Sequence, residues 1–217
     1  NTTGCQNNAI GTSALQSNTT GTLNQAFGSQ TLVGNTQGHC NQAIGNYALY
    51  SNTTGHNNNA IGKGSLYSNT DGDYNNAMGP YALCGNITGC YNNAIGPSAL
   101  KCNTTGGCNV AFGPNALYSS LSGKHNFAAG RNALNGNWGG SNNTAIGQSA
   151  LLSNTTGCNN TAIGHYALIS NKGSNNTAIG YNAMYANTTG GRNIGIGESA
   201  LAYNTTGCCN NAIGSSA

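Results

Sequence analysis

The stretch NQAIGNYALYSNTTGHN (residues 41–57) decides the fold, because the same pattern starts again at Asn58. The glycine of its Ala-Ile-Gly core recurs thirteen times along the 217 residues, at intervals of 17 except for one interval of 16, between Gly164 and Gly180. A fixed period over a whole chain is typical of a solenoid whose units stack on one another. We therefore expect one all-β domain over residues 1–217, a parallel β-solenoid (β-roll) of about thirteen 17-residue coils with no separate globular domain.

Repeat positions are numbered with Gln42 as position 1, so that Ala-Ile-Gly fills positions 2 to 4. Position 3 is Ile, Phe or Met in all coils but one, and position 8 is Leu in all but one. The segments between the position-4 glycine and the Asn-Thr-Thr-Gly sequence are too short for helices, which favours two short strands per coil. We expect positions 3 and 8 to face inward and to stack about 4.8 Å apart. Where Ala129 fills position 3, Phe127 is expected to restore the volume on the same face.

Asparagine is the most regular polar residue of the repeat. Position 11 is Asn except for Ser120, and position 17 is Asn in every coil. Stacked Asn side chains can hydrogen-bond along a parallel stack or satisfy turn backbone groups, so we predict a structural ladder. Its position-17 members are Asn7, Asn24, Asn41, Asn58, Asn75, Asn92, Asn109, Asn126, Asn143, Asn160, Asn176, Asn193 and Asn210.

Nine cysteines in a chain with only 4% charged residues favour an oxidising, extracellular location, secreted or on a cell or virion surface. Cys84 and Cys90 flank one turn, and Cys102 and Cys108 flank the next with the same spacing. Each pair can staple its own turn, which we favour slightly. The rival pairing, Cys84 with Cys102 and Cys90 with Cys108, links neighbouring coils at a separation of about 5.8 Å, which also suits a disulfide.

The cysteines nearest the two ends of the sequence suggest a joint between copies. Cys5 and Cys208 share position 15, and Cys209 follows at position 16. A second copy placed end to end would bring Cys208 and Cys209 within one coil of the next copy's Cys5. The hypothesis is an intermolecular disulfide along a head-to-tail filament, with free thiols or a vicinal Cys208–Cys209 pair as the alternatives.

The sequence offers little to a metal, a cofactor or a catalyst. His39, His56 and Asp73 share position 15 in successive coils and are weak metal candidates, although exposed filler is the better interpretation of that position. The chain has only three Asp and Glu residues, so a pair of carboxylates for acid/base catalysis is not expected. We therefore expect no enzyme and no cofactor.

Charge and hydropathy also narrow the partners. Six Lys/Arg are scattered without a basic stripe, which argues against nucleic acid, and the apolar runs are too short for membrane insertion. Recurring tyrosines suit lateral packing or sugar stacking. Asn-x-Thr sequences at position 11 are either turn chemistry or glycan acceptors.

The units NNAIGPSALKCNTTGGCNVAFG (92–113) and NTAIGQSALLSNTTGCNNTAIG (143–164) resemble the head repeats of trimeric autotransporter adhesins, and more closely the repeats of phage tail-fibre and related viral fibre proteins. The resemblance covers all 217 residues and implies a left-handed β-roll, often trimeric, that binds host surfaces. This repeat is about three residues longer than those of the adhesins and is rich in cysteine, which favours a disulfide-reinforced filament.

The predicted function is therefore a structural subunit of an extracellular fibre, which associates with itself as a head-to-tail polymer or a trimer. The alternative is an adhesin head or tail-fibre shaft that binds a surface glycan or host receptor. Ice binding is a third possibility, weakened because the paired threonines sit at a turn and their side chains diverge.

Overall fold

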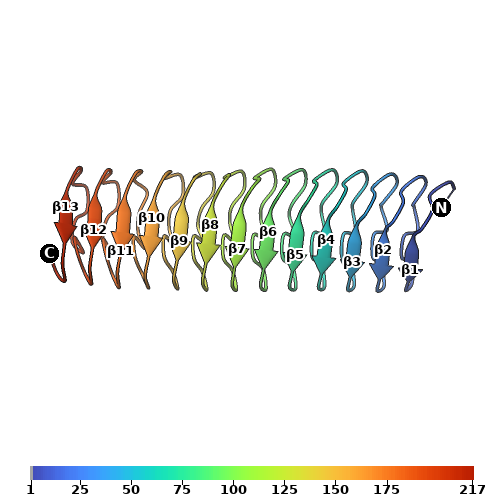
Figure 1. The fold of residues 1–217 in the computed structure, drawn as a ribbon, viewed down its shortest axis with the longest axis horizontal. Helices are drawn as coiled ribbons and strands as arrows, with labels where there is room; N and C mark the ends of the chain where they lie inside the picture. The colour runs from blue at the N-terminus through green and yellow to red at the C-terminus, as the bar shows by residue number, and fades with distance from the viewer. Residues whose placement is uncertain (1) are drawn as a thin grey trace. The chain divides into compact units, whose positions relative to one another are not determined.

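The computed structural model describes residues 2–217 and confirms the predicted fold class. Thirteen parallel strands, one per repeat, form a β-solenoid of about twelve turns, and the residues described contain no helix. Every strand occupies positions 1 to 3 of its repeat, and the rest of each coil closes behind it (Figure 1). The strands are β1 Asn8–Ile10, β2 Gln25–Phe27, β3 Gln42–Ile44, β4 Asn59–Ile61, β5 Asn76–Met78, β6 Asn93–Ile95, β7 Val110–Phe112, β8 Phe127–Ala129, β9 Thr144–Ile146, β10 Thr161–Ile163, β11 Thr177–Ile179, β12 Ile194–Ile196 and β13 Asn211–Ile213.

The chain divides into two compact units, Asn1–Cys108 with β1 to β6 and Asn109–Ala217 with β7 to β13. Within each unit every strand pairs in parallel with the next one along the chain, in the register of the repeat, as in Ala43 with Ala60. In the 16-residue repeat the register shifts to match, so that Ala162 pairs with Ala178. The missing residue is therefore absorbed outside the strands, in the turn, as predicted.

The expected second strand is not present, because positions 5 to 10 form a continuous run of turns in each coil. Two residues of this run have left-handed backbone, as at Tyr47 (φ 61°) and Leu49 (φ 50°). Left-handed residues interrupt the extended conformation that a strand requires. The coils still bond to each other here, since the N–H of Leu49 donates to Ser65 O over 3.0 Å. The prediction correctly located this side of the coil but gave it the wrong conformation.

The core is narrower than predicted, because the position-3 side chains point outward. Ala43, Ala48 and Leu49, at positions 2, 7 and 8, are fully buried, whereas Ile44 at position 3 is 43% exposed. A strand of three residues places positions 1 and 3 on one face and position 2 on the other. The buried face is the one that carries the small Ala. Phe127 does share a face with position 3, as expected, but that face is the outer one, where its ring contacts Phe112.

Two exceptions to the repeat compensate each other inside the core. Met184 replaces the usual Leu at position 8, and Gly195 replaces the usual Ala at position 2 of the following coil. A Cβ on Gly195 would lie 2.9 Å from Met184 Cγ and 3.3 Å from its Sδ. The longer Met side chain thus fills the space that an alanine methyl group occupies elsewhere, which keeps the interior close-packed.

Position 16 is a further left-handed site, where Leu23 (φ 60°) is 49% exposed. Asn tolerates this backbone conformation better than Leu, and a β-branched residue tolerates it worst. We expect Leu23→Asn to raise the free energy of unfolding by about 0.5–1 kcal/mol. Leu23→Thr, equally polar, should lower it, and urea denaturation of the two variants measures the contrast. Equal effects of Asn and Thr would show that polarity, not backbone strain, decides.

Candidate functional site

The position-17 asparagines form the predicted ladder inside the coil wall. Asn58 shows the pattern: its backbone N–H donates to Asn41 Oδ1 over 3.0 Å, and its Nδ2 donates to the same oxygen over 3.2 Å. The Nδ2 also donates to Gly72 O over 2.7 Å. Members of the ladder from Asn24 to Asn193 are buried, and each of these amides is satisfied by its neighbours along the stack.

A second ladder, at position 11, meets the first at one backbone carbonyl. Asn52 Nδ2 donates to Asn35 Oδ1 over 2.8 Å and to Gly55 O over 3.0 Å. Gly55 O also accepts from Asn41 Nδ2, over 2.8 Å. A Cβ on Gly55 would lie 2.5 Å from Asn52 Oδ1, so only glycine leaves room for this junction.

Burial of the position-11 amides settles how the Asn-x-Thr sequences are used in the folded chain. Asn52 and Asn86 are fully buried, and their Nδ2 atoms already donate two hydrogen bonds each. A glycan on this nitrogen would remove one of its two donated hydrogen bonds and would need space that the buried site lacks. These sequences therefore serve the turn and the ladder.

Ser120 interrupts the position-11 ladder. A serine has no amide, and its Oγ is buried without a hydrogen-bond partner among residues 2–217. Asn137, one coil further on, donates only to Gly140 O where its counterparts also donate to the preceding position-11 residue. The second unit therefore contains a local defect in an otherwise regular network.

We expect Ser120→Asn to repair this defect and to raise the free energy of unfolding by about 1–2 kcal/mol, because two buried hydrogen bonds form. Thermal or urea unfolding measures the change. Ser119→Asn is the matched control, since it adds the same amide one residue away from the ladder, and should change stability little. A destabilised Ser120→Asn would mean that the site lacks space for the amide.

Position 15, where metal ligands were considered, is a row of hydrogen-bond acceptors. The N–H of His39 donates to His56 Nδ1 over 3.0 Å, and the N–H of His56 donates to Asp73 Oδ1 over 2.7 Å. The N–H of Asp73 in turn donates to Cys90 Sγ over 3.3 Å. Ser141 and Cys158 accept in the same way in the second unit. His, Asp, Ser and Cys share an acceptor close to Cβ, which explains why these different residue types occur here, whereas Gly107, Lys124 and Gly191 at the same position offer no such acceptor.

This row does not have the geometry of a metal site. The His39 and His56 rings stack with centroids 5.0 Å apart, and their Nδ1 atoms already accept backbone protons. In residues 2–217 no three His, Cys, Asp or Glu side chains come together to hold a metal ion. The side chains of His39, His56 and Asp73 are thus used to join one coil to the next.

The acceptor role can be tested at His56. His56→Leu removes the partner of the His39 N–H and should lower the free energy of unfolding by about 1 kcal/mol. His56→Asn keeps an oxygen at nearly the same distance from the backbone and should leave stability close to that of the wild type. Urea denaturation of both variants distinguishes them, and equal losses would argue that ring stacking is what His56 contributes.

The predicted disulfides do not form, since all nine cysteines are free. Cys90 Sγ accepts from the Asp73 N–H and donates to Thr88 O over 3.4 Å, so its thiol is engaged with the preceding coil and its own turn. Burial raises the pKa of the Cys84 thiol, opposed by the nearby Lys101 ammonium. A thiol with a raised pKa is mostly protonated and reacts slowly. Neither turn staples nor the rival pairing, with Cys102 and Cys108, is present.

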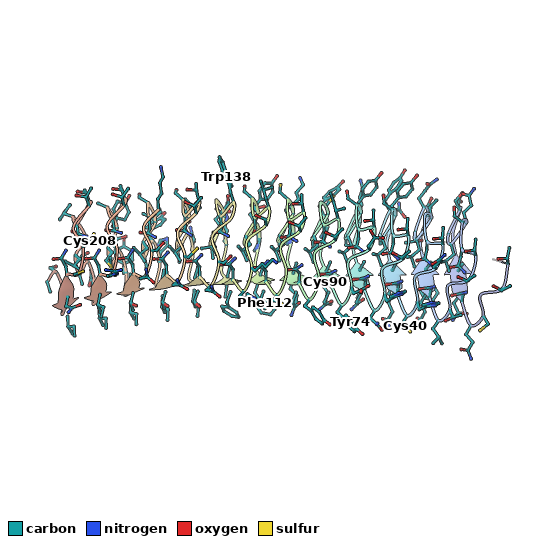
Figure 2. The ribbon with its side chains drawn as sticks, turned by 90° about the horizontal axis from the view of Figure 1, so that it is seen from above. Cys40, Tyr74, Cys90, Phe112, Trp138 and Cys208 are labelled. Carbon is teal, nitrogen blue, oxygen red and sulfur yellow. The ribbon has the colours of Figure 1, made fainter. Side chains whose placement is uncertain are left out.

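The cysteines proposed to join copies are on the surface. Cys5, Cys208 and Cys209 are exposed, and Cys208 appears on the flank of its coil in Figure 2. Cys208 Sγ accepts from the Gly191 N–H over 3.4 Å, in the same manner as the other position-15 thiols. An intermolecular bond at these residues stays a prediction.

Tyrosines stack on one another along the first unit. Tyr50 and Tyr67 lie 5.1 Å apart at 4°, and Tyr74 and Tyr91 lie 5.0 Å apart at 3°. Because the rings cover each other's faces, fewer faces are open for stacking on a sugar. This geometry supports packing along the coils.

The outer face of the strands carries the large apolar side chains that were expected in the core. The position-3 side chains form a row of apolar groups along each unit, and Phe112 projects from the strand side in Figure 2. The members, from half-buried to largely exposed, are Ile10, Phe27, Ile44, Ile61, Met78 and Ile95 in the first unit and Phe112, Ala129, Ile146, Ile163, Ile179, Ile196 and Ile213 in the second. We call this the position-3 row.

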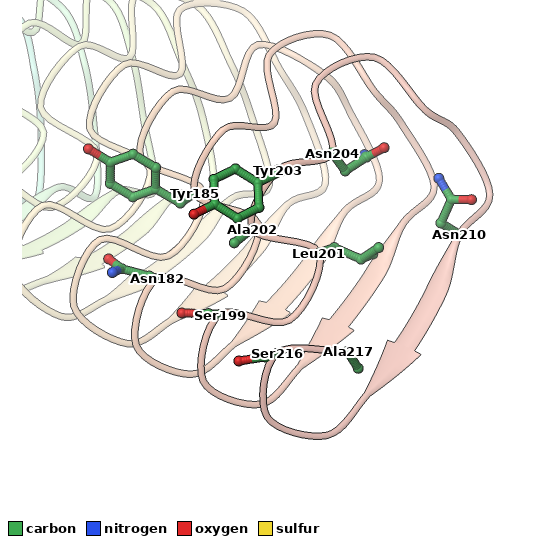
Figure 3. Close-up of a pocket in the computed structure, with 10 residues that line it drawn as sticks. All are labelled: Asn182, Tyr185, Ser199, Leu201, Ala202, Tyr203, Asn204, Asn210, Ser216 and Ala217. Carbon is green, nitrogen blue, oxygen red and sulfur yellow. The ribbon is translucent and has the colours of Figure 1, made fainter.

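A hollow of about 770 Å³ lies over the last coils of the second unit (Figure 3). Leu201, Tyr203 and Asn204 line it, together with Tyr185 and Ala217. Leu and Asn at these repeat positions are covered by the following coil elsewhere in the unit. The hollow is therefore formed by core and ladder positions that another coil covers elsewhere in the unit. The residues that line it include no set of catalytic side chains.

Comparison with protein-family models, with curated proteins and with solved structures finds no match for this chain. Within residues 2–217 there is also no helix of the length and apolar character needed to cross a membrane.

Proposed function

We propose that this chain is a structural subunit of an extracellular fibre, in which copies of the chain pack side by side through the position-3 row. The observation that carries the proposal is the exposure of that row, with Ile44 43%, Met78 38% and Ile146 38% exposed. Soluble monomers rarely leave a long contiguous apolar strip in water. Burial of the row against another chain offsets this cost.

A second copy of the chain is the partner that fits the row best. The apolar groups recur once per coil, about every 4.8 Å, and another copy presents the same repeat. Positions 1 and 3 of all strands are uncharged, so two such faces meet without repulsion between like charges. The extracellular part of the proposal rests on composition, namely nine cysteines and very few charges.

The test is the mass of the protein in solution for a variant with a polar row. We expect the wild type to sediment as a multimer, and the triple variant Ile44→Thr, Ile61→Thr and Met78→Thr to associate about 100-fold more weakly because apolar burial is lost. Thr keeps the strand preference of the site. Analytical ultracentrifugation over a range of concentrations measures both.

The matched control makes three polar-to-Thr changes at exposed positions of the same unit outside the strands, with Gln16→Thr, Gln37→Thr and Asn46→Thr. It should leave the association unchanged. At a protein concentration of about 1 mM, any association with a Kd below about 1 mM is detected. A wild-type protein that is still monomeric at this concentration would contradict the proposal.

A further inference from the structure

In several Asn-Thr-Thr-Gly turns the backbone N–H groups converge on one oxygen of the next coil. In the first unit the N–H groups of Thr53, Thr54 and Gly55 donate to Thr70 O over 2.9, 3.2 and 3.1 Å. In the second unit the N–H groups of residues 188–190 share the carbonyl oxygen of the next turn in the same way. Successive N–H groups aimed at one point form a nest, a concave site suited to a negatively charged oxygen.

One nest in the interior of the second unit, with a further coil after it, lacks this carbonyl acceptor. It belongs to the turn at residues 154–157, and the coil that follows is the 16-residue repeat, whose turn is only Asn171-Lys172-Gly173. The N–H groups of Thr155, Thr156 and Gly157 have no acceptor in the described part of the chain. The deletion thus leaves three adjacent donors without the oxygen that they bind elsewhere.

The coil of this nest and the coil that follows keep hydrogen bonds to each other at both ends of the turn. Asn171 Nδ2 still donates to Asn154 Oδ1, over 3.3 Å, and to Gly173 O, over 2.9 Å. On the far side of the turn, the Cys158 N–H donates to Ser174 Oγ over 3.0 Å. The hydrogen bonds that flank the turn are therefore kept, and the three N–H groups between them lack the acceptor that equivalent groups have.

Positive charge lies beside the open nest. Lys172 is exposed and belongs to the shortened turn itself. Arg192 lies on the same edge two turns on from the nest, where its N–H donates to Ser174 O over 3.1 Å, and it lines a hollow of about 260 Å³ with Ser174. The second unit contains four Lys/Arg and a single carboxylate, Glu198, so little negative charge competes for these donors.

We propose that the turn at residues 154–157, together with Lys172, binds a small oxyanion, the group presented by a carboxylate, sulfate or phosphate. One oxygen of the anion takes the place of the missing carbonyl, and the ammonium group of Lys172 balances its charge. Water fills the nest otherwise, and a charged acceptor forms hydrogen bonds about twice as strong as a neutral one. The site is independent of the position-3 row and of the fibre role.

The experiment is a titration of the isotope-labelled wild-type protein, followed by the amide signals in two-dimensional NMR at constant ionic strength with chloride as the reference salt. Acetate, sulfate and phosphate are the three probes, and their ranking identifies the class of anion. We expect the amides of residues 155–157 to shift and saturate with a Kd of about 1–20 mM. The equivalent amides of residues 53–55, whose nest is filled, should not move.

Three variants locate the binding. Insertion of Thr between Asn171 and Lys172 restores the 17-residue turn and its carbonyl, and should abolish the shifts. Lys172→Gln should weaken binding by about threefold to tenfold, since it removes an exposed charge. Lys124→Gln, an exposed lysine of the same unit, is the matched control and should bind as the wild type does.

The proposal is overturned if none of the three probes shifts these amides up to about 100 mM. It is also overturned if the insertion variant, shown to be folded by its dispersed spectrum, binds as the wild type does, which would indicate an adventitious ion only. Should the insertion prevent folding, the decision falls to the pair of lysine variants: equal affinities for Lys172→Gln and Lys124→Gln refute the site, and a selective loss at Lys172 supports it.

Discussion

The structure depends on the glycine carbonyl at position 14, where the two asparagine ladders meet. Gly55 O accepts one amide from its own turn and one from the preceding coil, from Asn52 and Asn41. Each coil is thereby joined to its neighbours by side chains that are buried and fully hydrogen-bonded. Loss of one partner would leave a buried polar group unpaired, which strongly destabilises a folded chain. With so few apolar side chains inside, this polar network replaces much of what a larger hydrophobic core supplies in an ordinary domain.

The same network sets what the surface displays. Because the interior is filled by Ala, Leu and Asn, the large position-3 groups have no room inside and lie on the outer face of the strands. Position 15 faces its neighbour along the stack, and its His, Asp, Ser and Cys members use their acceptor atom to bond the preceding coil. A set of residues that looks like a site in the sequence can thus be a structural row, and an apparent core position can be a surface.

The sequence predicts the repeat, the parallel stacking, the turn that absorbs the deletion and the ladder at Asn58, because each of these follows from the period alone. It does not predict which way Ile44 points, since Ala43 and Ile44 are both apolar and either can face inward in a three-residue strand. It also gives no sign of the left-handed backbone at Leu49, a residue type that seldom adopts it. The cysteine pairing was wrong for a related reason: spacing fixes how close two residues come, but not where Cys90 Sγ is aimed.

The pairing of Met184 with Gly195 shows that this chain tolerates change when it is made in two adjacent coils together. Since every coil bonds only to the one before and the one after, recombination that duplicates or removes whole 17-residue units leaves each remaining bond intact. Each such event alters the length by about 4.8 Å. The number of repeat units encoded in the gene therefore sets the length of the solenoid. This length can change by one coil at a time without any new sequence having to be selected.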